Sequence, residues 1–316
     1  MNKSSIVDAI GNTPLIYLDK LTSDIPARVA VKLEFMNPGG SIKDRMAYHI
    51  IRKGMERGDI TPETTIIEVT SGNTGTSLAM LGALYGLEVI LVVSSKVSAE
   101  KVATMKAFGA EVVKVNGSFQ EQEEAALKIG AERGKFFYVA QSSNMDNAEA
   151  HYLTTGPEIW RDTKGKVTHW VAGIGTGGTL MGTCRFLKEM KSSIKCIGVD
   201  PKGSVIYPSF KNMDGFEYSE YQIEGIGSDF VPPLLDFELI DDIVQVDDIE
   251  SFRMSRELAL REGIFGGGSS GANILAALRI ASNLTPDDLV VTVIPDSGYK
   301  YITKIYNDEW LSRISE

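Results

Sequence analysis

Residues 32–45 read KLEFMNPGGSIKDR and carry the change from strand to helix around which the other segments of the chain can be arranged. An Asn-Pro-Gly-Gly turn ends an apolar run, and Ser41 followed by Asp44 has the form of a helix capping box. Lys43 is therefore expected in the first turn of a helix, where backbone N–H groups and the helix dipole disfavour its ammonium form. A neutral amine is the nucleophile that a Schiff base needs, although a solvated surface lysine is the alternative.

The composition is that of an ordinary globular protein. The chain has 316 residues, of which 43% are apolar and 23% charged, which is enough for two domains. The formal charge of −10 and the lack of a basic stripe argue against a nucleic-acid partner. The first residues lack the apolar core of a signal peptide, and no apolar run approaches the length of about 18 residues that a membrane span needs. We therefore expect a cytoplasmic protein with no membrane or nucleic-acid partner.

Cysteines and histidines are few and show no metal-site or catalytic-triad spacing. Cys184 and Cys196 lie 12 residues apart without a CxxC motif, and the histidines are His49, His151 and His169. We expect buried thiols and no metal.

Apolar periodicity predicts two series of alternating strands and helices. After a strand at 29–35 and the helix that Lys43 opens, the first series has strands at 65–69, 89–93, 112–115 and 136–141 and helices at 77–85, 99–108 and 120–133. The second has strands at 167–172, 194–200 and 289–294 and helices at 179–190, 249–262 and 272–281. This alternation predicts two α/β domains with parallel sheets, and the aperiodic segment 202–237 predicts a long loop that lines a cleft.

Three glycine-rich turns precede helices. Residues 70–75 (TSGNTG) offer hydroxyls and N–H groups for a carboxylate, and residues 173–179 (GIGTGGT) suit a phosphate monoester. Residues 266–271 (GGGSSG) place a serine at a helix start. We expect all three turns and Lys43 at the carboxyl ends of strands, where α/β sheets bind ligands, so that they form a pocket for an amino acid and a phosphorylated aldehyde.

Two other interpretations of these turns stay open. Each turn could serve only to connect a strand with a helix. Gly173, Gly175 and Gly178 also satisfy GxGxxG, and Asp200 ends the next expected strand where an acid could bind a ribose. A nicotinamide-dependent oxidoreductase is therefore an alternative.

The order of these motifs resembles the cysteine synthase and cystathionine β-synthase family of pyridoxal-phosphate enzymes. The matching segments are 38–45, 70–75, 173–179, 224–230 and 267–271, and the resemblance runs from about Ile6 to Trp310. It implies fold type II, similar to the tryptophan synthase β chain, with two three-layer α/β domains and the active site in the cleft between them. The implied large cofactor-binding domain is 1–36 plus 147–316, and the small substrate-binding domain is 37–146.

The resemblance also implies a role for individual residues. Lys43 would hold pyridoxal 5'-phosphate as a Schiff base and move the substrate Cα proton. The other cofactor-binding residues would be Asn73 at the phenolic oxygen, Gly175, Thr176, Gly177, Gly178 and Thr179 at the phosphate, and Ser269 at the pyridine nitrogen. The substrate would meet Thr70, Ser71, Thr74 and Gln141 through its carboxylate and Gly225 and Gly227 near its amine.

The implied reaction is β-replacement on serine or an O-activated serine by a thiol. Residues 224–232 (EGIGSDFVP) and 198–204 (GVDPKGS) look more like cystathionine β-synthases than cysteine synthases, although Ser228 replaces a bulkier residue. Glu224 and Asp229 could receive the amino group of homocysteine or act as a base toward water, or they are solvated loop acids. Cysteine synthase and a cysteine β-lyase that releases hydrogen sulfide are alternatives. A homodimer is implied, and no haem or adenosylmethionine response is expected.

Overall fold

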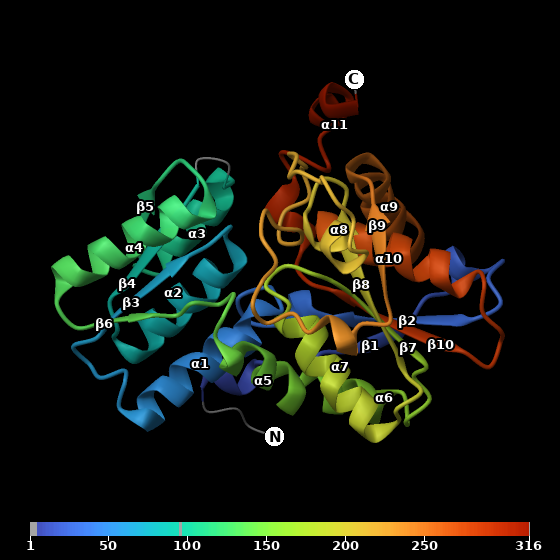
Figure 1. Ribbon diagram of the computed structural model, residues 1–316, viewed down its shortest axis with the longest axis horizontal. Coiled ribbons are helices and arrows are strands. Elements are labelled where there is room, and N and C mark those ends of the chain that lie inside the picture. The colour runs from blue at the N-terminus through green and yellow to red at the C-terminus, as the bar shows by residue number, and fades with distance from the viewer. Residues whose placement is uncertain (1–4, 95–96, 316) are drawn as a thin grey trace.

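The computed structural model describes residues 5–94 and 97–315, which form two β-sheets with helices on their faces (Figure 1). The larger sheet has the strand order β1-β2-β10-β7-β8-β9. Only β1 runs antiparallel to its neighbour β2 in this sheet. The strands are β1 (Leu15–Tyr17), β2 (Arg28–Leu33), β7 (His169–Gly173), β8 (Lys195–Pro201), β9 (Asp242–Val246) and β10 (Leu289–Ile294).

Helices cover both faces of the larger sheet because successive strand residues point to opposite sides. Val29 and Val31 of β2 belong to the apolar core beneath α9 (Asp248–Glu262) and α10 (Gly268–Ala281). Ala30 belongs to the core on the other face, with α6 and α7. The bounds of these two helices are Thr155–Asp162 and Gly178–Met190, and two shorter helices are α8 (Ile206–Phe210) and α11 (Asp308–Ser315).

The smaller sheet has the order β5-β4-β3-β6 and is parallel throughout. Its strands are β3 (Thr65–Val69), β4 (Val89–Val93), β5 (Glu111–Lys114) and β6 (Phe136–Tyr138), and its helices are α1 (Lys43–Arg57), α2 (Asn73–Tyr85), α3 (Ala99–Ala107) and α4 (Phe119–Arg133). Ile66 packs on the side of α1 and α2, whereas Ile67 packs on the side of α4. Helix α5 (Met145–Leu153) contacts both α1 and α7 and so joins the two sheet systems (Figure 1).

The predicted fold class is confirmed, and several predicted strands coincide with the observed ones. The strands at 65–69, 89–93 and 289–294 have the predicted bounds. Strands β1 and β9 and helices α5, α6, α8 and α11 were not predicted, and α8 lies within the segment 202–237 that was expected to be a loop. Helices α5 and α6 have a mixed polar sequence without a clear apolar period. The domain bounds 1–36, 37–146 and 147–316 stay a prediction. In the described part of the chain, no helix combines the length and apolar character that a membrane crossing needs.

The predicted capping box is wrong, although Lys43 does open α1. The residue at the N-cap is Ile42, and the Ser41 hydroxyl accepts a hydrogen bond from the Lys43 N–H at 3.3 Å. The Asp44 carboxylate instead accepts from the Gly39 N–H at 2.6 Å and from the Ser77 hydroxyl at 2.5 Å. Asp44 is buried between the preceding loop and α2, so it ties these two segments together rather than capping its own helix.

The cysteines are buried as predicted, but the prediction of free thiols is wrong. Cys184 of α7 and Cys196 of β8 are joined by a disulfide, with their Cα atoms 5.9 Å apart. The sequence separation of 12 residues did not show that α7 packs back against the neighbouring strand.

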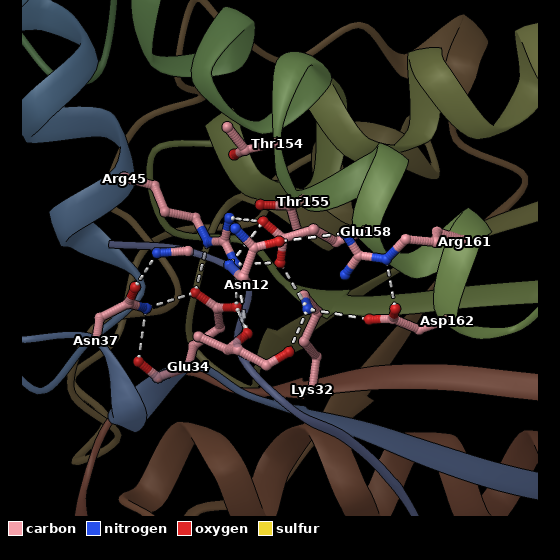
Figure 2. Close-up of polar contacts among 12 residues, drawn as sticks. Asn12, Lys32, Glu34, Asn37, Arg45, Thr154, Thr155, Glu158, Arg161 and Asp162 are labelled. Atoms are coloured by element: carbon pink, nitrogen blue, oxygen red, sulfur yellow. Dashed lines mark hydrogen bonds and ion pairs between the residues drawn. The ribbon is translucent and has the colours of Figure 1, made fainter. Parts of the chain in front are cut away.

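A buried network of charges attaches α1 to the larger sheet (Figure 2). The Arg45 guanidinium contacts Glu34 through Nε at 2.7 Å and Glu158 of α6 through Nη1 at 2.7 Å. Lys32 of β2 completes the network with its Nζ 2.7 Å from Glu158. All four side chains are buried, and the two positive charges balance the two negative ones. Burial acts to raise the pKa of Glu158, but the hydrogen bonds and charges of Arg45 and Lys32 hold it at about 2.

Replacing Glu158 with Gln should therefore destabilise the fold. The change leaves Arg45 and Lys32 with one buried carboxylate, and we expect a loss of about 3 kcal/mol in the free energy of unfolding. Urea denaturation at pH 7 measures this loss, and Glu132→Gln, at an exposed position, is the control.

The pH dependence gives a second check on the same variant. The stability that Glu158 contributes is present above its unfolded-state pKa of about 4.3 and is lost as the pH falls toward its folded-state pKa of about 2. The difference between wild type and Glu158→Gln should shrink over this range. Equal stability of both proteins at pH 7 would contradict the assigned role of the network.

Candidate active site

A cavity of 780 Å³ is lined by residues that follow strands of both sheets. Two of the three predicted turns, 70–75 after β3 and 173–179 after β7, lie at the carboxyl ends of strands as expected. The third, 266–271, follows α9 rather than a strand, so that part of the prediction is wrong. It still lies beside the carboxyl end of β10, because the Gly267 N–H donates to the Asp296 carbonyl at 3.3 Å.

Lys43 lies at the start of α1 and lines this cavity. Burial lowers the pKa of its amine, and the charge of Asp296 opposes this effect in part. Among the described residues, none forms a hydrogen bond or ion pair with the Lys43 amine. The amine is therefore available to a carbonyl compound in the cavity.

Hydrogen bonds within the turn at 70–75 fix its shape, and the turn leads into the N-terminus of α2. The Thr70 hydroxyl accepts hydrogen bonds from the N–H groups of Gly72 at 3.0 Å and Gly75 at 3.2 Å. The Thr74 hydroxyl donates to Gln141 Oε1 at 2.6 Å, and Gln141 Nε2 donates to the Val69 carbonyl at 2.9 Å. Ser71 lines the cavity with an exposed side chain. These hydroxyl, amide and N–H groups at the start of α2 suit a carboxylate.

A strained backbone supports the position of Gln141. Ala140 just before it has φ +52°, in a region that non-glycine residues seldom adopt. Such strain persists only where the surroundings hold the residue in place, and it is common at ligand sites.

Close backbone approach explains the glycines of the turn at 173–179. A Cβ atom on Gly175 would lie 2.6 Å from the carbonyl oxygen of Gly225, and one on Gly178 would lie 2.0 Å from Asn147 Oδ1. Gly177 has φ +87°. The turn therefore presents backbone N–H groups at the start of α7 with no side chain in the way, which is the arrangement that binds phosphate.

The two threonines of this turn are held by side chains of α5. Asn147 Nδ2 donates to the Thr176 hydroxyl at 2.9 Å, and the Thr179 hydroxyl lies 3.2 Å from His151 Nε2. Burial, with the nearby charge of Arg45, lowers the pKa of His151 well below its usual value, so the imidazole is neutral at pH 7.

Ser269 and Asn73 line the cavity from opposite sheet systems. Ser269 is buried in the first turn of α10, and no hydrogen bond joins its hydroxyl to another described residue. Asn73 opens α2, where its Nδ2 donates to Asp296 at 2.8 Å and its Oδ1 accepts from Lys300 at 2.8 Å.

The two acids of the loop near the cavity differ in their surroundings. Glu224 forms ion pairs with Lys101 at 2.5 Å and Lys304 at 2.6 Å. Burial acts to raise its pKa, but these two charges outweigh burial and lower it. Asp229 is exposed. Glu224 is therefore a paired group that connects α3 to the opposite side of the cavity, and Asp229 is a solvated one. Gly225 and Gly227 line the cavity between them.

The geometry does not favour binding of a dinucleotide at the turn 173–179, which carries the GxGxxG pattern. The Asp200 side chain is buried and accepts a hydrogen bond from the Tyr207 N–H at 2.9 Å. Burial raises its pKa to about 6. A carboxyl group enclosed in this way is not presented to a ribose.

One cluster outside the cavity has ligand types that metals use. The ligand atoms of His49, Asp146 and Glu149 lie within 4.8 Å of one another. Glu149 already pairs with Lys53 at 2.8 Å, and Asp146 pairs with Arg57 at 2.9 Å. These cations balance the carboxylates, so the cluster is an ion-pair network.

Sequence reasoning missed several residues around the cavity. Asn147, His151, Asp296, Lys300 and Tyr301 all contact predicted site residues or one another. Among these residues, only Asp296 had a recognisable signal, because it lies two residues after the end of a predicted strand. The others come from helices and loops whose distance from the site in the sequence hides their contacts.

Comparisons with known proteins agree with this geometry. The family described as "Pyridoxal-phosphate dependent enzyme" matches residues 6–296. The chain is 42% identical to a cystathionine beta-synthase of Apis mellifera over 97% of its own length, but spans only 62% of that protein. It is 38% identical to cysteine synthase B of Salmonella typhimurium over 98% of both chains.

A solved structure supports the same relationship. The O-acetylserine dependent cystathionine beta-synthase of Helicobacter pylori superimposes with a TM-score of 0.90 at 39% identity, over 97% of this chain and 100% of that one. This chain therefore belongs to the family of pyridoxal-phosphate-dependent enzymes that includes cysteine synthases and cystathionine β-synthases.

Proposed function

We propose that this enzyme catalyses β-replacement on serine or an O-activated serine by a thiol, with homocysteine as the thiol and cystathionine as the product. The observation that supports this most is the convergence of three groups on one cavity. These are the unpaired Lys43 amine, the carboxylate-type turn at 70–75 and the phosphate-type turn at 173–179.

The residues around the cavity fit pyridoxal 5'-phosphate. The glycine-lined turn before α7 suits the phosphate of the cofactor. The amine of Lys43, which lines the same cavity, can react with the aldehyde of the cofactor when it is neutral. We propose that the cofactor is held by Lys43, Asn73, Gly175, Thr176, Gly177, Gly178, Thr179 and Ser269. When bound, pyridoxal phosphate supplies an electron sink that makes the substrate Cα proton acidic and a β-substituent able to leave.

The substrate-facing residues orient the amino acid and handle its proton. We propose that Thr70, Ser71, Thr74 and Gln141 bind the α-carboxylate together with the N–H groups at the start of α2. Gly225 and Gly227 let the opposite loop approach the amine without a side chain between. Lys43, once released, takes the proton from the substrate Cα and can return it there.

The hydroxyl of Ser269 keeps the cofactor a weak electron sink. A neutral serine donates or accepts one hydrogen bond at the pyridine nitrogen, whereas a carboxylate there would favour its protonation. A weaker sink favours loss of a β-substituent over transamination or racemisation.

The choice of thiol rests on the loop at 224–232 and on the names of relatives. Both the Apis mellifera protein and the Helicobacter pylori structure are named cystathionine beta-synthases, and the second name specifies O-acetylserine. The Salmonella typhimurium relative, a cysteine synthase, supports the alternative product cysteine from sulfide. A β-lyase that releases hydrogen sulfide from cysteine remains a further alternative, because it needs the same groups in the cavity. A nicotinamide-dependent oxidoreductase is a remote alternative that leaves Lys43 without a role.

The setting of the enzyme is also a proposal. We propose a homodimer in the cytoplasm whose partners are small amino acids and thiols. We also propose that residues 1–36 with 147–316 form the cofactor-binding domain and residues 37–146 the substrate-binding domain.

Removal of the Lys43 amine should abolish turnover. We expect Lys43→Ala to lose at least about 10³-fold in kcat, because both covalent cofactor attachment and proton transfer at Cα depend on this amine. Steady-state assays with added pyridoxal phosphate measure the loss, and Lys106→Ala on the exposed side of α3 is the control. Near wild-type turnover by Lys43→Ala would refute the mechanism.

The substrate pair can be identified from the products. Mass spectrometry should detect cystathionine after incubation with homocysteine and either L-serine or O-acetylserine. Parallel reactions contain O-acetylserine with sulfide, or L-cysteine alone. Cysteine in the third vessel without cystathionine in the first two would replace our proposal by cysteine synthase, and rapid sulfide release from cysteine alone would identify a lyase.

Capture of the cofactor should depend on pH through Lys43. Only the neutral amine attacks an aldehyde, and burial lowers the pKa of this amine in the folded protein. The association rate of pyridoxal phosphate with the cofactor-free enzyme should rise with pH and reach half of its maximum below pH 10.5, the ordinary lysine value. Stopped-flow absorbance measures the rate, with Nα-acetyl-lysine amide as the reference. An inflection at or above that of the reference would show that Lys43 is an ordinary solvated lysine.

A further inference from the structure

Asp296 occupies a junction of three segments that line the cavity. It lies two residues after β10 and has no exposed surface. Its backbone forms an antiparallel bridge with Ser41, two residues before Lys43. Its carbonyl accepts from the N–H of Gly267, two residues before Ser269. One residue therefore contacts the segments that carry Lys43 and Ser269 through its main chain alone.

The side chain of Asp296 reaches the third segment, at the start of α2. Its Oδ2 accepts hydrogen bonds from Asn73 Nδ2 at 2.8 Å and from the Tyr301 hydroxyl at 2.7 Å. Burial and the charge of Asp296 raise the pKa of Tyr301 well above its usual value, so its hydroxyl stays a donor. Among the described residues, Oδ1 has no hydrogen-bond partner. A Cβ atom on Gly267 would lie 2.3 Å from Oδ1, so only glycine lets the carboxylate approach this turn.

The contacts of Asn73 determine which way its amide faces. Asn73 Nδ2 donates to Asp296, and Asn73 Oδ1 accepts from Lys300 Nζ at 2.8 Å. The reverse orientation would place an oxygen against the carboxylate and an NH₂ group against an ammonium, and both contacts would be unfavourable. An amide nitrogen has two N–H groups, so one stays available after the bond to Asp296 is made.

We infer that Asp296 is a positioning residue that orients Asn73 so that its remaining N–H faces the phenolic oxygen of pyridoxal phosphate. This inference rests on the role proposed above for Asn73 and extends it to a residue that lies behind it. Lys300 supports the same orientation from the oxygen side of the amide. The carboxylate reaches the cofactor through Asn73, and its charge also acts on the Lys43 amine, which both forms of the cofactor would meet alike. Its loss should therefore change the recognition of one cofactor oxygen beyond any change in binding that is common to all cofactor forms.

Two cofactor forms make this recognition measurable. Pyridoxal phosphate and its 3-deoxy analogue differ only in the phenolic oxygen that Asn73 would contact. The ratio of their dissociation constants from the cofactor-free enzyme is measured by absorbance or fluorescence titration. The phenolic oxygen also affects how the aldehyde reacts with Lys43, but this effect is shared by all variants that keep Lys43, so a change in the ratio between variants reports the contact with Asn73. For a hydrogen bond to a charged oxygen we expect wild type to prefer pyridoxal phosphate by about 30-fold.

Asp296→Ala should lower this preference to about threefold or less, close to the value for Asn73→Ala. Asp296→Asn keeps an oxygen acceptor and should restore the preference to about 10-fold, because a neutral acceptor makes a weaker bond. Asp308→Asn, whose side chain is 89% exposed, should match wild type.

The outcomes separate positioning from a merely structural role. If Asp296→Ala weakens binding of both cofactor forms by the same factor, or of neither, the ratio stays at the wild-type value and the inference is overturned. If Asp296→Ala does not fold, Asp296→Asn decides, since a wild-type ratio for that variant also overturns it. The readout is binding rather than turnover, so an enzyme with the expected ratios but no β-replacement activity would refute the proposed function and leave this inference standing.

Discussion

The position of the cavity residues on α1 depends on the buried ion pairs that the Arg45 guanidinium forms with Glu34 and Glu158. Arg45 lies two residues after Lys43 on α1, and its partners belong to the segment after β2 and to α6. Figure 2 shows these side chains converging from three parts of the chain. A buried charge with fixed partners allows few alternative positions, because any shift would leave it unpaired at a cost of several kcal/mol. The network therefore holds the start of α1, and with it the Lys43 amine, against the larger sheet.

Parallel strand topology supplies the rest of the geometry. Strands β3 and β7 belong to different sheets, yet each ends in a turn that opens a helix toward the same cavity. Helix starts bring N–H groups and a positive potential, so one face of the cavity suits a carboxylate and another suits a phosphate. Polar contacts also join the two sheet systems, since Lys101 of α3 forms an ion pair with Glu224 and Asn73 of α2 donates a hydrogen bond to Asp296. These polar contacts therefore link the part of the molecule that carries the turn at 70–75 to the part that carries the turn at 173–179. A movement of one part relative to the other would have to break them.

Several side chains that line the cavity are held by residues that do not line it themselves. Asn147 and His151 hold the two threonines of the phosphate-type turn, and Asp296 with Lys300 sets the orientation of Asn73. Such support matters because a site that is loose by 1 Å loses much of its binding and catalytic power.

Sequence alone was sufficient for features that depend on local chemistry. The period of apolar residues predicted the α/β class and the strands at 65–69, 89–93 and 289–294, and glycine spacing predicted the turns. The sequence also predicted that Lys43 opens a helix. Tertiary structure alone decided which groups are free and which are paired. Asp44 accepts hydrogen bonds from Gly39 and Ser77 instead of capping its helix, and Glu224 forms ion pairs with two lysines. Cys184 of α7 forms a disulfide with Cys196 of β8. Each of these outcomes depends on contacts between elements whose packing a local pattern does not encode, because a buried polar group takes whatever partner the neighbouring element presents.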